Sequence, residues 1–399
     1  MVMSVDSAIC DKPKRRPGVF STGFALFSMF FGAGNLIFPL LIGKTSGTET
    51  PAALVGLMIS AVAFPLMGLI AMMLYQGNLH RFLERLGKGP SRCLMFVLLV
   101  TQGPLCMSRL FTLMYASIQP YLPLSLAMFS VLAGILVFFL TYRPQRIVSI
   151  LGVILTPFLI LSLAALVFSG MMNPPPIQQV FEGPSFHFLH GLKGGYMTMD
   201  LISALLFATM ILPYLSQGLE HLSEEAAEKE VRRKMVGASL FAALLLMLAY
   251  LGLCSLSAHY SPVLGDGVAP QDLLRTIAVQ ILGPLGGAIA AIAVFLACFT
   301  TAIALAAVFA DYLRKDLLKE RISSEVSLGT TLVITAGLAN LGFSGLLKLM
   351  GPLLETLYPS LIILCVLNIA YSLYRVKPLK VPVFLALALA LAGLMKEVV

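Results

Sequence analysis

Met29-Phe30-Phe31-Gly32-Ala33-Gly34-Asn35-Leu36-Ile37-Phe38-Pro39 lies in the middle of the first long apolar stretch of this chain. Two glycines, an asparagine and a proline so close together disfavour a continuous helix. At membrane depth, irregular backbone is tolerated only where protein buries it or where it lines a cavity. The segment therefore predicts a first helix that is unwound in its middle and forms a binding site there. The alternative is that Gly32 and Gly34 only allow a neighbouring helix to pack closely.

The composition around this segment is that of a membrane protein. Of the 399 residues, 58% are hydrophobic and 12% are charged, and the mean hydropathy is +0.93. The charged fraction is about half that of a soluble domain, which excludes a soluble fold. Each apolar run is long enough to cross a hydrocarbon core of roughly 30 Å. Because the runs are continuous and do not alternate, they predict helices rather than a barrel, and the chain is expected to be an all-α polytopic membrane protein.

The apolar runs divide the chain into eleven predicted spans, and a twelfth is left open. Residues 272–283 are predicted to form a short amphipathic helix in a loop rather than a crossing. The predicted spans are 19–43, 52–76, 93–118, 122–141, 147–170, 196–218, 235–257, 284–312, 327–343, 350–374 and 379–396.

The basic residues orient these spans. Sorting Lys and Arg by alternate sides places 21 on the side of the N-terminus and five on the other. The positive-inside rule then predicts a cytoplasmic N-terminal tail over residues 1–18. No small-residue cleavage site follows the basic start, so the first helix is expected to remain as its own signal. The net charge of +8 therefore orients the chain, and nucleic acid is not an expected partner.

The predicted break would leave two helix ends at mid-depth. The outer half would begin near Asn35, where unpaired N–H groups and the positive end of the helix dipole suit a carboxylate. The carbonyl groups before it suit a cation or an ammonium group, so a zwitterion fits both ends. We therefore expect substrate contacts at Gly32, Ala33, Gly34 and Asn35, and cation contacts at Phe30 and Phe31.

Ionisable side chains within the spans are few, and three are candidates for gating or coupling. Arg109 is expected to face the interior of the bundle, where it could pair with Glu355 or with backbone carbonyl groups. Asp200 opens the sixth predicted span, where its carboxylate could cap the helix or act in substrate or proton coupling. Because fixed charges are scarce, a substrate with a third ionised group is not expected.

Several blocks of sequence resemble the bacterial branched-chain amino acid:cation symporter family. They follow in the family's order from residue 19 to about 375 and include the run from Met29 to Pro39. This family is similar to the wider amino acid–polyamine–organocation superfamily. The other matching blocks are Gly195 to Asp200 with Ala204 to Phe207, Ala297 to Ile303, Gly103 to Leu105 with Arg109, and Tyr358-Pro359; Ser108, Ala208 and Ala304 depart from the family pattern.

The resemblance implies a LeuT-type fold, in which two inverted five-helix repeats enclose a site between broken helices 1 and 6. It implies repeats at 19–170 and 196–374, an extracytoplasmic loop at 171–195 and an additional C-terminal helix at 375–399. It adds Ser203 to the expected substrate site. Phe207 is a candidate for the wall around an apolar side chain, with ordinary packing as the alternative. The resemblance also implies that the hydroxyl groups of Thr300 and Thr301 bind sodium, although a threonine within a helix often bonds a carbonyl group of its own helix instead.

The implied function is import of leucine, isoleucine and valine by cation symport with Na⁺, or with H⁺ as the alternative, in the inner membrane of a bacterium. A channel is less favoured because no rings of like charge or filter loops occur. The motifs of membrane-embedded enzymes and the phosphate-binding loop of ATPases are missing as well, so neither an enzyme nor an ATPase subunit is expected. His187 and His190 have a spacing that suits a metal, but incidental loop histidines are the favoured reading, with no cofactor and no metal beyond the coupling ion. The expected partners are the amino acid and the lipid bilayer.

Overall fold

The computed structural model describes residues 18–142, 151, 155–219, 222–265, 267–375 and 380–398. Helices account for nearly all of these residues, and no strand occurs among them. Most of the predicted N-terminal tail and the first part of the predicted fifth span lie outside the described residues.

In the first half of the chain, one described pass is interrupted, between α1 and α2, and π-helical turns lie within two others. A π-helical turn, η2 (Ile59–Ala63), joins α3 to α4, and another, η3 (Thr101–Leu105), joins α6 to α7. The helices are α1 (Val19–Phe30), α2 (Ala33–Ser46), α3 (Thr50–Met58), α4 (Phe64–Leu74), α5 (Leu79–Glu84), α6 (Lys88–Val100), α7 (Cys106–Ile118), α8 (Leu126–Thr141) and α10 (Thr156–Met171).

The second half contains longer helices. Its helices are α11 (Pro184–Tyr196), α12 (Asp200–Ser216), α13 (Glu224–Leu264), α14 (Leu273–Tyr312), α15 (Ser324–Ala339), α16 (Gly342–Tyr374) and α17 (Lys380–Val398), with the π-helical turn η6 (Leu313–Leu317) after α14. Gly283 has non-helical dihedral angles (φ 62°, ψ −150°) within α14 and separates a short helix from the long pass that begins at Pro284. This agrees with the short helix predicted over 272–283.

Over the described residues, the helices group into eleven apolar passes, counting α1 with α2 and α11 with α12 as one pass each. The positions agree with the predicted spans except at the sixth. The structure places α11 within 184–196, a segment that the sequence assigned to the loop. The reason is composition, because His187, His190 and Lys193 make this half-helix too polar to resemble a span. It nevertheless packs closely on α3 and buries His187, Gly191 and Gly195.

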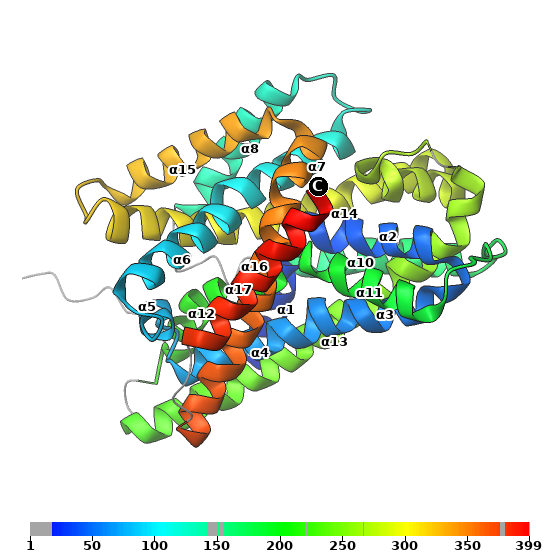
Figure 1. The fold of residues 1–399 in the computed structure, drawn as a ribbon. Coiled ribbons are helices and arrows are strands. Elements are labelled where there is room, and N and C mark those ends of the chain that lie inside the picture. The colour runs from blue at the N-terminus through cyan, green and yellow to red at the C-terminus, as the bar shows by residue number, and fades with distance from the viewer. Residues whose placement is uncertain are drawn as a thin grey trace, which may run out of the picture.

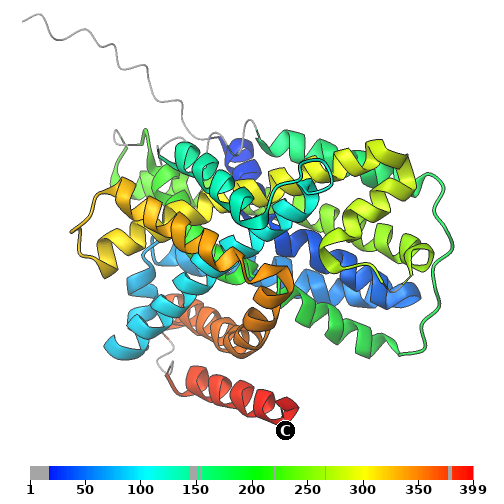
Figure 2. The ribbon, with the colours of Figure 1, turned by 90° about the horizontal axis from the view of Figure 1, so that it is seen from above.

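The broken helices lie in the centre of the molecule. In Figure 1, α2 and α3 run beside α11 and α13, and α3 packs closely on α11 while α2 packs on α13. Gly56, Gly191 and Gly195 allow the backbones of α3 and α11 to approach, since a Cβ atom at any of these positions would collide with the opposite helix. Figure 2 shows that α17 lies at the edge of the bundle, where it packs against α16.

Candidate functional site

The first helix is interrupted where the sequence predicts. α1 ends at Phe30 and α2 begins at Ala33, and between them Phe31 (φ −73°, ψ 80°) and Gly32 (φ −114°, ψ −155°) leave the helical region. The side chain of Asn35 accepts a hydrogen bond from the Gly32 N–H group at 3.3 Å and so caps the N-terminal end of α2. All of these residues are buried. The predicted unwound stretch of helix 1 is therefore confirmed.

The sixth helix is interrupted between α11 and α12, over Met197, Thr198 and Met199. Met199 adopts the left-handed conformation (φ 67°) although it is not glycine. An L-residue in this conformation is strained, and such residues persist only where the surrounding structure holds them. Met199 is fully buried, so packing on all sides fixes this break.

The two breaks touch each other at Gly34. A Cβ atom on Gly34 would lie 2.8 Å from the Thr198 Cα atom and 3.0 Å from the Met197 carbonyl oxygen. Arg109, on α7, fills the third side, because its Nη2 atom lies 3.0 Å from the same Cβ position. Gly34 thus also allows close packing, as the alternative from the sequence predicts, and its packing partner is the backbone of the helix 6 break.

Asp200 belongs to a buried polar cluster that joins three helices. Its Oδ2 atom accepts hydrogen bonds from Asn35 Nδ2 at 2.6 Å and from the Tyr250 hydroxyl at 2.9 Å, and the Asn35 amide also donates to Tyr250. The carboxylate does not cap α12, whose N-terminus has no side-chain cap. The capping alternative is therefore wrong, and Asp200 links the breaks of helices 1 and 6 to α13.

Arg109 faces the interior, and its partner is a backbone carbonyl. Its Nη1 atom donates to the Met197 oxygen at 3.0 Å, at the C-terminal end of α11. Glu355 is half-buried on α16, and among the residues that the structure describes no carboxylate forms an ion pair with Arg109. Of the two partners that the sequence allowed, the structure shows the carbonyl group, and the pairing with Glu355 is wrong.

Thr300 and Thr301 both face the end of α1. Their hydroxyl oxygens lie 2.9 and 3.1 Å from the Ser28 carbonyl oxygen, and 3.0 and 3.1 Å from the carbonyl oxygen of Ala297 in their own helix. The bond to a carbonyl group of their own helix is therefore present, while sodium binding by this cluster of four oxygen atoms stays a prediction. The sequence named the carbonyl groups from Phe30 onward, and the structure brings Ser28 to the threonines.

Ser203 and Phe207 lie one turn apart on α12, on the side that meets helices 1 and 3. The Ser203 hydroxyl accepts a hydrogen bond from the Gln102 amide and donates to the Met199 carbonyl oxygen at 3.1 Å. The Phe207 ring packs edge-on against Phe30, with the ring centroids 5.6 Å apart. Sequence reasoning missed Gln102 and Tyr250, although an amide in the third span and a tyrosine in the middle of the seventh were available signals.

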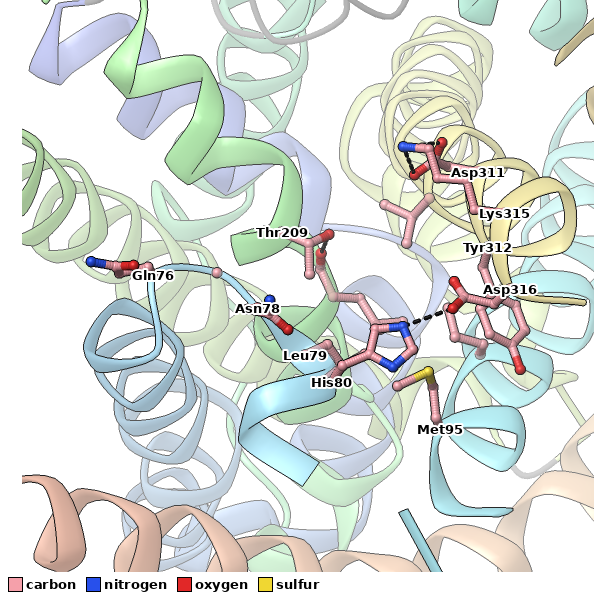
Figure 3. Close-up of a pocket in the computed structure, with 14 residues that line it drawn as sticks. Gln76, Asn78, Leu79, His80, Met95, Thr209, Asp311, Tyr312, Lys315 and Asp316 are labelled. Atoms are coloured by element: carbon pink, nitrogen blue, oxygen red, sulfur yellow. Dashed lines mark hydrogen bonds and ion pairs between the residues drawn. The ribbon is translucent and has the colours of Figure 1, made fainter. Parts of the chain in front are cut away.

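A cavity of about 430 Å³ is lined by the α4–α5 turn and by parts of α5, α6, α12 and the α14–η6 junction. Figure 3 shows His80 and Asp316 joined across it, with Nε2 and Oδ1 2.7 Å apart, and Lys315 paired with Asp311. Leu206 and Thr209 also line the cavity and flank Phe207 in the sequence of α12. The cavity therefore reaches the helix that carries the predicted substrate residues.

The two histidines in α11 contact the end of α2. His187 Nδ1 lies 3.1 Å from the Ser46 hydroxyl, and His190 Nε2 lies 3.0 Å from the Thr45 hydroxyl. Within the described part of the chain, no group of three His, Cys, Asp or Glu side chains could hold a metal ion. These histidines belong to a helix and join the outer halves of helices 1 and 6.

A helical membrane protein whose first and sixth helices are both interrupted at one central site has the architecture of a LeuT-fold secondary transporter. Solved structures agree with this class. They include Mhp1, a nucleobase-cation-symport-1 family transporter, in a closed conformation with bromovinylhydantoin bound (TM-score 0.61, 13% identity, 96% of this chain and 94% of that chain). They also include MhsT in complex with L-phenylalanine (TM-score 0.54, 15% identity, 94% and 100%) and a Na⁺-coupled sialic acid symporter (TM-score 0.56, 12% identity, 94% and 88%). These likenesses confirm the predicted fold class.

The chain belongs to the family of branched-chain amino acid transport proteins, whose sequence model matches residues 16–398. One relative is the branched-chain amino acid transport system 3 carrier protein of Pseudomonas aeruginosa, which is 28% identical over 90% of this chain and 82% of its own length. Another is the branched-chain amino acid permease BrnQ of Bacillus subtilis, which is 27% identical over 89% of this chain and 81% of its own length. The family confirms the resemblance and the prediction of a multi-pass membrane transporter rather than an enzyme.

Proposed function

We propose that this protein imports leucine, isoleucine and valine together with sodium, by alternating access around the two helix breaks. The observation that carries the proposal is the convergence of two hydroxyl groups and two carbonyl groups where α1 ends. Sodium, like other hard cations, prefers oxygen ligands, and this cluster consists of oxygen atoms alone.

The oxygen cluster at the end of α1 has more hydrogen-bond acceptors than protons to donate, which favours a cation. Thr300 and Thr301 each lie within hydrogen-bond distance of two carbonyl oxygens, on Ser28 and Ala297, but each hydroxyl group has a single proton. Two protons are thus shared among four contacts, which leaves lone pairs without a donor. A cation among these oxygen atoms would satisfy them once the hydroxyl groups rotate. The carbonyl groups of Phe30 and Phe31, at the same helix end, would complete the site.

The substrate would lie between the breaks, with Gly32, Ala33, Gly34 and Asn35 on one side and Ser203 and Phe207 on the other. The edge-on pair of Phe30 and Phe207 offers an apolar wall suited to an aliphatic side chain. The names of the relatives, branched-chain amino acid carriers and permeases, support the same class of substrate.

The basic residues support a direction of transport and an orientation of the chain in the membrane. The α5 segment and the region after α14 carry positive charge, and both border the cavity in Figure 3. We therefore propose that this cavity opens to the cytoplasm and releases substrate there, that the N-terminus is cytoplasmic, and that the membrane is a bacterial inner membrane. The ion gradient would drive transport without an ATPase subunit or an organic cofactor.

The test is uptake of radiolabelled leucine into proteoliposomes with an inward sodium gradient, an inward proton gradient, or neither. Uptake driven by sodium, inhibited by isoleucine and valine but not by lysine or glutamate, is the expected result. Strong inhibition by lysine would contradict the proposed substrate class.

Proton coupling is the second candidate, because one specific observation favours it. Asp200 is a fully buried carboxylate, and the partners of its Oδ2 atom are the neutral groups of Asn35 and Tyr250. A buried carboxylate without a cationic partner is a suitable proton carrier. Uptake driven by the proton gradient alone would select this mechanism.

A further inference from the structure

Two opposite charges meet at the helix breaks without pairing. Arg109 and Asp200 are buried to 1% and 0% relative exposure, and in the described part of the chain no ion pair joins them to each other or to another side chain. Buried charges are normally paired, because an isolated charge in a low-dielectric environment is very unfavourable. A separated pair at a ligand site therefore suggests that the ligand supplies the missing partners.

Each of the two side chains has one polar atom without a hydrogen-bond partner. These atoms are Asp200 Oδ1 and Arg109 Nε. Asn35 and Tyr250 donate hydrogen bonds to Oδ2 of Asp200, and Nη1 of Arg109 donates one to the Met197 oxygen. Both side chains are thus fixed in position, and each keeps a free acceptor or donor.

The surroundings of Arg109 favour an anion. Its Nη2 atom lies beside Gly34, in the first turn of α2, where unpaired N–H groups carry the positive end of the helix dipole. A guanidinium group and a helix N-terminus both carry positive charge, so an anion that lies beside both is stabilised by each of them. Asp200, held by Asn35 across the same break, supplies the negative counterpart for an ammonium group.

We propose that Arg109 and Asp200 bind the two charged groups of the amino acid substrate, with the carboxylate on Arg109 and the ammonium group on Asp200. The proposal rests on the proposed function and assigns its main polar ligands to side chains rather than to the helix ends alone. It makes the site specific for zwitterions, because a ligand that lacks either group leaves one buried charge without a partner. Lysine and glutamate would add a third charge for which the site has no partner.

The experiment measures displacement of radiolabelled leucine from the purified full-length chain in sodium buffer. The competitors are unlabelled leucine, 3-methylbutylamine, which lacks the carboxylate, and 4-methylpentanoate, which lacks the ammonium group. For Asp200→Asn we expect leucine affinity to fall roughly ten- to hundredfold, together with the affinity for the amine, while 4-methylpentanoate is unaffected. For Arg109→Gln we expect the reverse selectivity, and Arg109→Lys, which keeps the charge, should restore part of the carboxylate affinity.

Asp272→Asn and Arg275→Gln are the matched controls, because these residues pair with each other at 3.6 Å where α14 begins and should leave binding unchanged. Equal loss of all three ligands in both site variants would overturn the proposal and indicate a structural role. A change confined to the sodium dependence of Asp200→Asn would also overturn it. If the wild-type chain does not bind leucine, the proposed function itself fails, whereas normal wild-type binding with unchanged variants refutes only this inference.

Discussion

The breaks in helices 1 and 6 perform the same geometric task with different sequences. In helix 1, Gly32 occupies an extended conformation just before α2, whose first turn contains Gly34 and Asn35. In helix 6, the interruption contains Met197, Thr198 and Met199, with no glycine or proline among them, and Met199 is left-handed. The first break is a local property of the chain, whereas the second is imposed by the residues packed around it.

This difference indicates that the helix 6 break depends on the helix 1 break. The helix 1 break needs no strained residue. Because Gly34 has no side chain, the backbone of Met197 and Thr198 packs directly against it. Arg109 and Asp200 then hold the helix 6 break through Met197 and through Asn35. We infer that helix 6 unwinds at this point because helix 1 and Arg109 supply the partners for its free backbone groups.

The largest effect is expected where the two breaks touch. Gly34→Leu should abolish leucine binding, because even the Cβ atom would meet the Thr198 backbone, which cannot rotate away as a side chain can. Leucine binding and the size-exclusion profile of the purified variant are the measurements. Gly337→Leu is the matched control, since no atom lies within 4 Å of the Cβ position of Gly337. Normal leucine binding by Gly34→Leu would show that the breaks do not depend on this contact.

The threonine cluster tests whether the end of α1 binds the ion. Thr300→Ala and Thr301→Ala each remove one oxygen atom from a charged partner, a loss of about 1.5–3 kcal/mol, or roughly ten- to hundredfold in apparent sodium affinity. Excess sodium should restore leucine uptake, because coupling between two sites is reciprocal. The measurement is leucine uptake against sodium concentration, with a proton gradient as control. If both variants titrate like the parent, proton coupling through Asp200 becomes the mechanism to test.

The comparison also explains what the sequence can predict. The helix 1 break and the span positions follow from local signals, namely glycine and apolar runs, whereas the two threonines became candidates only through the resemblance to the family. The contacts of Asp200 with Asn35 and Tyr250 join residues 165 and 50 positions away, and no local pattern encodes such pairs. The half-helix α11 is polar, so its own hydropathy gives no signal for a span, and its contacts with α3 place it in the bundle.

Met199 tests whether packing imposes the second break. Met199→Ile should lower the free energy of unfolding by about 1–2 kcal/mol more than Leu201→Ile does, because a β-branched residue in the left-handed region is a strong outlier. Leu201 is equally buried but lies in the regular part of α12, so it controls for the change of side-chain shape. Thermal unfolding of both variants in the same detergent is the measurement. Equal stability would mean that residue 199 can leave the left-handed conformation at little cost.

The smallest effect is expected at Gly32, the other glycine of the first break. Its φ of −114° is extended and open to any residue, so Gly32→Ala introduces no backbone strain. The new Cβ atom would lie 3.0 Å from Leu110 Cδ2 and 3.0 Å from Thr301 Oγ1, both ends of side chains that can shift by a few tenths of an ångström. We therefore expect leucine binding at saturating sodium to be retained, with a loss of sodium affinity below about tenfold, less than the full loss of a charged hydrogen bond. Sodium titration of leucine binding by Gly32→Ala and Gly34→Ala, side by side, is the measurement. The two glycines look equivalent in the sequence, so an equal response to both substitutions would mean that both serve only to loosen the helix. A severe defect confined to Gly34→Ala would instead show that Gly32 lies beside the ion site and that Gly34 supports the second break.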